Sequence, residues 1–220
     1  MKAKDLIVSE FPALSLEDSG EKALRLMNEY HVFHLPLLQR DNYLALVSED
    51  DILDWDTPEE PLSLAEFISF RPAVFEGTHP YEAIKIVREF NLTVIPVVNK
   101  QNHYAGIITL ESLFNFLTDS ISFQSEGSIL VLEMERRNYS LSEIARICES
   151  NDINILNLSI NNYDEKGMMW VTIKVNVNDI KALIATFERY NYTVVDTFSS
   201  EVFKDDMQHN YNMLMHYINF

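Results

Sequence analysis

The sequence is poor in cysteine, glycine and basic residues, and each shortage excludes a class of protein. Its one cysteine, Cys148, cannot form a disulfide within the 220-residue chain, which excludes the cross-linked framework of small secreted proteins. Only 17 Lys and Arg residues stand against 34 Asp and Glu residues, so the formal net charge is −17. Because nucleic acids and anionic membranes bind basic surfaces, this balance argues against both as partners.

Long hydrophobic runs are also missing. No apolar run approaches the length of about 18 residues that a membrane-spanning helix needs. The first residues include the charged Lys2, Lys4 and Asp5, where a signal peptide would have an apolar core. We therefore expect a cytoplasmic protein that is not bound to a membrane.

The motifs of common enzymes are absent as well. The chain has five glycines and contains no P-loop, no Gly-x-Gly-x-x-Gly and no Gly-x-Ser-x-Gly. Neither His31 nor His34 has a cysteine or a paired carboxylate at the spacing of a metal site. Cys148 lies among apolar residues at helical spacing, which predicts a buried side chain and not a nucleophile. We expect a protein that is not an enzyme, with no catalytic residue, no metal and no required cofactor.

The chain does contain an internal repeat. Residues 43–53 recur in altered form as residues 104–114, at an offset of 61. Leu-Pro-Leu-Leu at residues 35–38 corresponds to Ile-Pro-Val-Val at residues 95–98, at an offset of 60. Two copies of this length indicate a pair of similar modules and not a solenoid.

Each copy has the periodicity of a short strand, a helix, two strands and a second helix. In both copies an apolar strand ends at a hydroxyl residue, Ser48 or Thr109, just before a predicted helix. The free N–H groups at the start of a helix suit anions. At the first helix of the chain, Asp18 and Glu21 have the spacing of a capping box, so we expect Asp18 to be the cap.

The two copies resemble the CBS-domain family. The resemblance rests on the β-α-β-β-α order, the apolar-Pro-apolar strand and the Gly-apolar-apolar-Thr/Ser-x-x-Asp ending, and it covers roughly residues 1–122. It implies two modules that fold as a pair and bind AMP, ADP, ATP or S-adenosylmethionine as a regulatory ligand in the clefts between them.

The resemblance also implies ligand-binding residues. Ser48 and Thr109 match the family's hydroxyl residue, which contacts phosphate, and Asp51 matches the carboxylate that binds the ribose diol. Ser112 stands at that position in the second copy, which favours one competent site centred on Ser48 and Asp51. The residues before the two prolines are implied to line the adenine pocket, namely Phe33, His34, Leu35, Thr93, Val94 and Ile95.

Two observations keep a ligand-free pair open. Ser48 and Asp51 are good helix-capping residues, and capping needs no ligand. Residues 49–60 include seven acids and no Lys or Arg, so a polyphosphate would be repelled more than adenosine, AMP or the cationic S-adenosylmethionine. The alternative to a ligand sensor is a dimerisation or interaction scaffold with degenerate clefts.

A third unit follows the repeat. Its periodicity predicts the β-α-β-β-α-β order of a ferredoxin-like domain, with Ser140 as a helix cap. Residues 128–199 resemble the ACT-domain family, which implies amino-acid binding or edge-to-edge pairing. In place of the family's Asp-Arg-Pro-Gly turn the chain has Glu-Arg-Arg-Asn, where Asn138 is expected to keep the turn at positive φ. The lost glycine favours dimerisation over an amino-acid site, and an ACT fold with neither role is the third alternative.

The sequence thus predicts an α+β chain of four parts. These are CBS module 1 (residues 1–62), CBS module 2 (63–125), an ACT-like domain (126–200) and an amphipathic tail (201–220), which packs on its own chain or on a partner. Two CBS modules followed by an ACT-like module resemble the acetoin-utilisation regulatory (AcuB-type) proteins. This architecture implies a regulator without a catalytic domain in the same chain. Together with the CBS and ACT resemblances, it leads us to expect a homodimer that senses an adenosine-type ligand and relays the signal to a protein partner.

Overall fold

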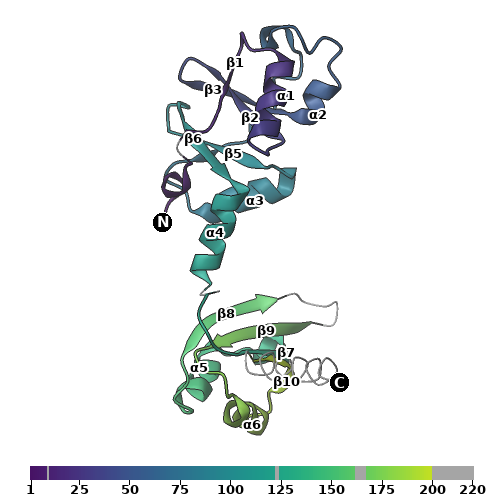
Figure 1. Ribbon diagram of the computed structural model, residues 1–220. Helices are drawn as coiled ribbons and strands as arrows, with labels where there is room; N and C mark the ends of the chain where they lie inside the picture. The colour runs from purple at the N-terminus through teal and green to yellow at the C-terminus, as the bar shows by residue number, and fades with distance from the viewer. Residues whose placement is uncertain (9, 122–123, 162–166, 200–220) are drawn as a thin grey trace, which may run out of the picture. The chain divides into compact units, whose positions relative to one another are not determined.

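The chain forms two compact units, Met1–Leu117 and Thr118–Phe220 (Figure 1). Each unit has a hydrophobic core of its own. The structure is a computed structural model that describes residues 1–8, 10–121, 124–161 and 167–199. The tail predicted at residues 201–220 lies outside the described residues.

The first module of the first unit contains a three-stranded sheet and two helices. Strand β1 (Leu14–Ser15) runs parallel to the central strand β2 (His34–Gln39), and β2 is antiparallel to β3 (Asn42–Ser48). Helix α1 (Gly20–Glu29) connects β1 to β2, and α2 (Glu49–Leu53) follows β3. The predicted β-α-β-β-α order is confirmed.

The second module repeats this design. Its sheet has the order β4 (Val74–Phe75), β5 (Val94–Val98) and β6 (Tyr104–Thr109), with the same parallel and antiparallel pairs. Helix α3 (Pro80–Phe90) connects β4 to β5, and α4 (Leu110–Ser120) follows β6. The repeat seen in the sequence is therefore a repeat of structure.

A proline lies in the middle strand of each sheet, where proline is usually excluded because it lacks the N–H of the ladder. The short first strands explain why it is tolerated. Strand β1 pairs only with Leu37 and Leu38, so it stops short of Pro36, and β4 pairs only with Val97 and Val98, short of Pro96. Each proline consequently has a paired strand on one side only.

The N-terminal segment packs on the second module. It contains a 3₁₀ turn, η1 (Ala3–Leu6). The N–H of Ala3 donates to the carbonyl of Thr78 at 2.8 Å, and the N–H of Val8 donates to that of Ile107 at 2.9 Å. The first residues of the chain are thus part of the fold of the second module.

The segment between the modules makes the reciprocal contact. It contains η2 (Leu62–Leu64), in which the N–H of Leu62 donates to the carbonyl of Asp18 at 2.8 Å. The N–H of Leu46 in β3 donates to the carbonyl of Phe70 at 2.9 Å. The predicted boundary between residues 62 and 63 falls inside η2, and the limits of the two modules remain a prediction.

The start of α1 differs from the prediction by one residue. Ser19 is the N-cap, and its Oγ accepts the N–H of Lys22 at 3.3 Å. Asp18, predicted as the cap, instead accepts the N–H of Ser15 at 2.8 Å and pairs with Lys22 Nζ at 2.5 Å. Its carboxylate closes the turn after β1, so the helix begins beyond it. The predicted cap Ser140 is confirmed, with the N–H of Glu143 donating to Oγ at 3.3 Å.

The second unit is a four-stranded antiparallel sheet with the order β10-β7-β9-β8, which is the ferredoxin-like order predicted from the sequence. Two helices pack on one face of it (Figure 1). Their apolar side chains meet alternate residues of the strands. The elements are β7 (Ile129–Glu135), η3 (Arg136–Asn138), α5 (Leu141–Glu149), β8 (Ile155–Asn161), β9 (Met168–Val175), α6 (Lys181–Arg189) and β10 (Thr193–Phe198).

The contact of the N-terminal segment with β6 depends on Gly106. This residue has a φ of +139°, and a Cβ built on it would lie 2.4 Å from Cγ2 of Ile7. We expect Gly106→Ala to lower the free energy of unfolding of the first unit by roughly 1–3 kcal/mol. Urea unfolding would measure this in a Trp170→Phe background, in which Trp55 is the remaining tryptophan and lies in the first unit.

Gly77 supplies the matched control, because a Cβ added there meets nothing within 4 Å. Gly77→Ala should change the free energy of unfolding by no more than about 0.5 kcal/mol. Equal urea midpoints for the two variants would contradict the tight packing of Ile7 on Gly106.

Candidate ligand-binding site

The turn between β6 and α4 places two hydroxyl groups side by side. Thr109 ends β6, and its Oγ1 accepts the N–H of Ser112 at 3.2 Å, as an N-cap side chain does. The hydroxyl oxygens of Thr109 and Ser112 are also 3.2 Å apart. The N–H of Leu110, the first residue of α4, donates to the carbonyl of Thr93 at 3.2 Å. The turn is therefore fixed to the start of β5.

The equivalent turn between β3 and α2 is closed by a carboxylate. The Oγ of Ser48 accepts the N–H of Asp51 at 3.1 Å. Asp51 Oδ2 accepts both the N–H of Ser48 at 3.1 Å and its hydroxyl at 2.6 Å, which completes a capping box. The carboxylate implied to bind ribose thus already has a local structural role, and ribose binding by Asp51 remains a prediction.

A cavity of about 630 Å³ opens beside the β6–α4 turn. Both modules line it. The first contributes the segment before β1, with Glu10 and Phe11, and the end of α1, with Tyr30 and His31. The second contributes Thr93, the residues from Thr109 to Ser112, and Asn115 of α4. The volume is in the range of small-molecule sites, and hydroxyl groups and aromatic rings face it together.

The predicted site residues occupy different surroundings. Thr93 and Thr109 line this cavity, whereas Ser48 and Asp51 are not among its lining residues. Phe33 lines two further cavities, of about 560 and 250 Å³. Leu35, Val94 and Ile95 are fully buried in the core of the unit, and their assignment to an adenine pocket remains a prediction.

His34 and Thr93 join the two modules where β2 and β5 begin. The Nδ1 of His34 accepts the N–H of Thr93 at 3.3 Å and lies 3.1 Å from its Oγ1. That Oγ1 also accepts the N–H of Phe33 at 3.0 Å. Because Nδ1 accepts from the backbone, it carries no proton, so the Thr93 hydroxyl donates to it. These hydrogen bonds bring together Phe33, His34 and Thr93, three of the residues predicted for the site.

An aromatic pair beside the cavity was missed by the sequence analysis. The rings of Phe11 and Tyr30 meet edge to face with their centroids 5.3 Å apart. The other module has the same arrangement, with Phe70 and Phe90 at 5.2 Å. The signal was available, since aligning the two copies places these aromatic pairs at offsets of 59 and 60 residues. Such rings can stack on a purine or attract a cation.

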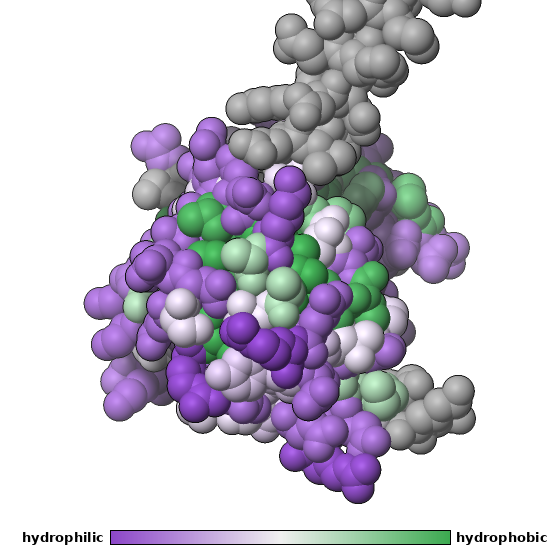
Figure 2. Space-filling model, turned by 90° about the horizontal axis from the view of Figure 1, so that it is seen from below, coloured by the Kyte–Doolittle hydropathy of each residue, from purple (hydrophilic) through white to green (hydrophobic). Residues whose placement is uncertain are grey.

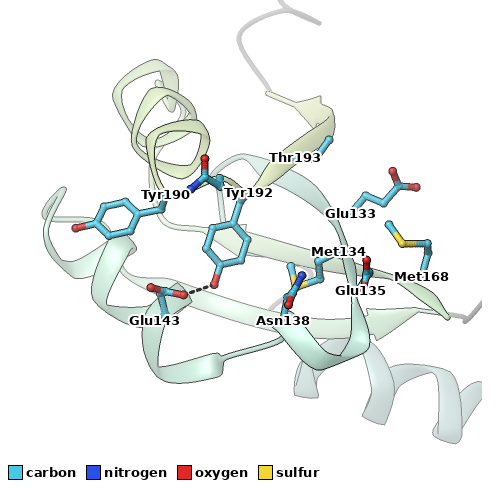
Figure 3. Close-up of a pocket in the computed structure, with 10 residues that line it drawn as sticks. Glu133, Met134, Glu135, Asn138, Glu143, Met168, Tyr190, Tyr192 and Thr193 are labelled. Carbon is cyan, nitrogen blue, oxygen red and sulfur yellow. Dashed lines mark hydrogen bonds between the residues drawn. The ribbon is translucent and has the colours of Figure 1, made fainter.

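The second unit has a cavity of about 540 Å³ between the end of β7, the start of α5 and the start of β10 (Figure 3). Glu143 Oε2 accepts the hydroxyl of Tyr192 at 2.9 Å, the dashed line in Figure 3. Burial, together with this bond, raises the pKa of Tyr192 to about 12. Glu133 accepts the indole N–H of Trp170 at 3.1 Å, and Glu135 pairs with Arg137 at 2.6 Å. The three carboxylates at this cavity therefore have partners already.

The turn predicted to need a left-handed residue does not have one. Residues Arg136–Asn138 form η3, and the φ of Asn138 is not positive. The prediction for Asn138 was wrong because a 3₁₀ turn keeps right-handed backbone angles throughout. The prediction that Cys148 is buried is confirmed, and burial raises the pKa of its thiol to about 11, far from that of a nucleophile.

Figure 2 shows one side of the molecule as a mosaic in which hydrophilic side chains separate smaller hydrophobic areas. Within the described ranges, no helix combines the length and hydropathy needed to cross a bilayer. The same residues contain no group of three His, Cys, Asp or Glu side chains placed to hold a metal ion.

Comparison with protein families identifies the repeated modules. Residues 3–57 and 66–119 each match the CBS domain family. The first unit is a CBS domain pair. The family match covers no residue between 120 and 220, so the ACT assignment of the second unit remains a prediction.

Two curated relatives match the CBS pair. The glycine betaine/carnitine/choline transport ATP-binding protein OpuCA of Bacillus subtilis is 25% identical over 119 residues, 54% of this chain and 31% of the relative. Inosine-5'-monophosphate dehydrogenase of Korarchaeum cryptofilum is 27% identical over 115 residues, 51% of this chain and 24% of the relative. The chain spans no more than about a third of the length of either protein.

Solved structures also resemble this chain over about half its length. A putative acetoin utilization protein (AcuB) from Vibrio cholerae is 21% identical, with a TM-score of 0.49 and coverage of 56% of this chain and 95% of that one. CBSX2 in complex with AMP is 20% identical, with a TM-score of 0.47 and coverage of 54% and 96%.

The contact between His34 and Thr93 predicts a pH dependence of stability. Burial lowers the pKa of His34 below its ordinary value of 6.5, although the charges of Asp51 and Asp50 oppose this. A histidine with a lowered pKa in the folded state adds no penalty above pH 6.5. As the pH falls from 6.5 toward the lower folded pKa, the unfolded chain gains a proton first and folding is disfavoured.

We therefore expect the thermal midpoint of the first unit to fall between pH 7.5 and 5.5, and His34→Asn to reduce this fall. The Asn Oδ1 lies where Nδ1 accepts its hydrogen bond, but Asn does not titrate. His103→Asn is the control, because that residue is exposed. Identical pH profiles for the wild type and His34→Asn would show that His34 does not contribute.

Proposed function

We propose that the protein is a regulator that binds an adenosine-type ligand in its CBS pair and passes the signal to a protein partner. CBS domain pairs are regulatory modules, and the resemblance stated above implies AMP, ADP, ATP or S-adenosylmethionine as ligand. The observation that carries the proposal is the cavity of about 630 Å³ between the two modules. A ligand held there touches both modules at once, so it can favour one arrangement of the pair over another.

The chemistry of the cavity suits a nucleoside. Thr109 and Ser112 bring hydroxyl groups to the cavity, and a hydroxyl group can both donate and accept hydrogen bonds. The ring pair that includes Phe11 offers a surface on which adenine could stack. The cleft at Ser48 and Asp51 is the second candidate location, as the resemblance implies.

A ligand-free scaffold is the alternative function, and one observation favours it. The first cleft has its ribose carboxylate engaged in a helix cap, and the second has Ser112 in place of that carboxylate. In this case the pair would serve to assemble a complex. Ligand-induced stabilisation separates the two functions.

Either function calls for a homodimer, which we propose forms through an apolar surface to which both modules contribute. Phe33, Leu110 and Phe114 are 58, 48 and 64% exposed. They surround the cavity of about 560 Å³ beside α3 and α4. Large apolar side chains gathered in this way favour coverage by another surface. An ACT-like second unit, as in the AcuB-type architecture, would add a further pairing surface.

We expect adenosine, AMP or S-adenosylmethionine to stabilise the first unit against heat. A ligand at 100 times its dissociation constant adds about 2.7 kcal/mol, which means a rise of roughly 5 °C or more in the thermal midpoint. Thr109→Val should abolish this rise, because it removes the hydroxyl that faces the cavity.

Thr109→Val also removes a helix cap, so it needs a control of equal structural cost. Ser140→Ala removes the cap of α5 in the second unit and should lower stability by a similar amount, about 1 kcal/mol, while the ligand-induced rise is kept. If Asp51→Ala abolishes the rise and Thr109→Val does not, the ligand binds at the first cleft. No rise with any ligand favours the scaffold.

The proposed dimer is tested by its mass. Light scattering at micromolar concentration should give twice the chain mass of 25.6 kDa. Phe114→Glu should give the monomer mass, because it places a charge in the apolar surface. Phe75→Glu is the control, since Phe75 is also exposed, at 56%, but lies outside this surface. A monomeric wild type would contradict the proposal.

A further inference from the structure

The cavity at the β6–α4 turn carries negative charge on two sides. Glu10 reaches it from the segment before β1, and Glu111 reaches it from the first turn of α4. Among the described residues that line it there is no Lys or Arg, and His31 is the one lining histidine. A phosphate chain entering the cavity would therefore meet carboxylates with no lining cation to offset them.

The N-terminus of α4 does little to compensate for these carboxylates. A helix start can hold an anion through its free N–H groups. Here the N–H of Leu110 already donates to the carbonyl of Thr93, and the N–H of Ser112 already donates to Oγ1 of Thr109. Two of the donors that would face a phosphate are thus in use. The remaining dipole competes with the full charge of Glu111 in the same turn.

The same lining suits a neutral or positively charged group. The rings of Phe11 and Tyr30 beside the cavity can stabilise a cation through their faces, and the carboxylates of Glu10 and Glu111 add to that attraction. We propose that this cavity selects adenosine compounds by charge. It accepts those that are neutral or cationic at the ribose 5′ position, such as adenosine and the sulfonium S-adenosylmethionine, and excludes polyphosphates.

This inference rests on the proposed function, and it assigns Glu111 and Glu10 as the residues that determine specificity. It applies to the cavity beside the β6–α4 turn, where the family's ribose carboxylate is replaced by Ser112. The other turn also has acids directly after its hydroxyl residue, at positions 49–51. Neither of these two turns contains a Lys or Arg residue that could pair with a phosphate.

The test compares the dissociation constants of adenosine, S-adenosylmethionine and ATP for the full chain, by calorimetry in buffer without Mg²⁺. We expect adenosine and S-adenosylmethionine to bind at least tenfold more tightly than ATP. Raising the salt concentration should strengthen ATP binding by the wild type, since salt screens the repulsion. The affinity for adenosine, which carries no charge, should stay within about twofold.

Charge reversal then assigns the effect to one residue. Glu111→Lys should raise the affinity for ATP at least tenfold, lower that for S-adenosylmethionine and leave that for adenosine within about twofold. Glu82→Lys is the control, because it makes the same change in net charge on the first turn of α3, outside the cavity. Unchanged affinities in Glu82→Lys would assign the change to position 111.

The outcomes separate this inference from the proposed function. Equal affinities for adenosine and ATP in the wild type, unchanged by Glu111→Lys, would overturn the charge selection and leave the sensor intact. A wild type that binds none of the three compounds would overturn both. A preference for adenosine that persists in Glu111→Lys would show that this carboxylate is not the selecting group.

Discussion

Each CBS module of this chain depends on a segment that precedes the other module. Residues 1–8 hydrogen-bond to the second module, and the segment around η2 hydrogen-bonds to the first. A buried backbone N–H group without a hydrogen-bond partner destabilises the folded state. Neither module is therefore complete alone. The pair is consequently the smallest unit that satisfies its own backbone. The cavity between the modules follows from this arrangement, since the crossing segment brings Glu10 and Phe11 beside Thr93 and Thr109.

The two turns after β3 and β6 show how one fold can treat equivalent positions differently. Asp51 and Ser112 occupy the same place in the repeat, and both contact the hydroxyl residue that caps the helix. Asp51 closes its cap with a charged hydrogen bond, which is the stronger kind. Ser112 closes its own cap with a neutral one and leaves the charge at this turn to Glu111. The two turns therefore share the same backbone arrangement but differ in which residues carry the negative charge.

Much of the fold could be predicted from the sequence, because hydrophobic periodicity and turn residues are local signals. The strand ends at Ser48 and Thr109 and the cap at Ser140 are examples. The candidate site could be predicted less well from the sequence, because it depends on contacts between distant parts of the chain. No local pattern brings Phe11 to Thr93 or His34 to Thr93. Leu35 and Ile95 are buried completely, and their place at an adenine pocket rests on the resemblance alone. Asp18 shows that even a local cap is ambiguous by one residue when two capping side chains are adjacent.

The hydroxyl of Thr93 has a further consequence. It has one proton, which it donates to Nδ1 of His34, and it also lines the cavity. A ligand that accepts a hydrogen bond from this hydroxyl breaks the hydrogen bond between Thr93 and Nδ1 of His34, and Nδ1 then becomes easier to protonate. Such a ligand would take up a proton from the buffer as it binds. Lower pH would in turn strengthen ligand binding, by the same factor by which the bound ligand strengthens proton binding at His34. A ligand that only donates to Thr93 would leave the buffer unchanged. The heat of binding measured in two buffers of different ionisation enthalpy would distinguish these two hydrogen-bonding modes.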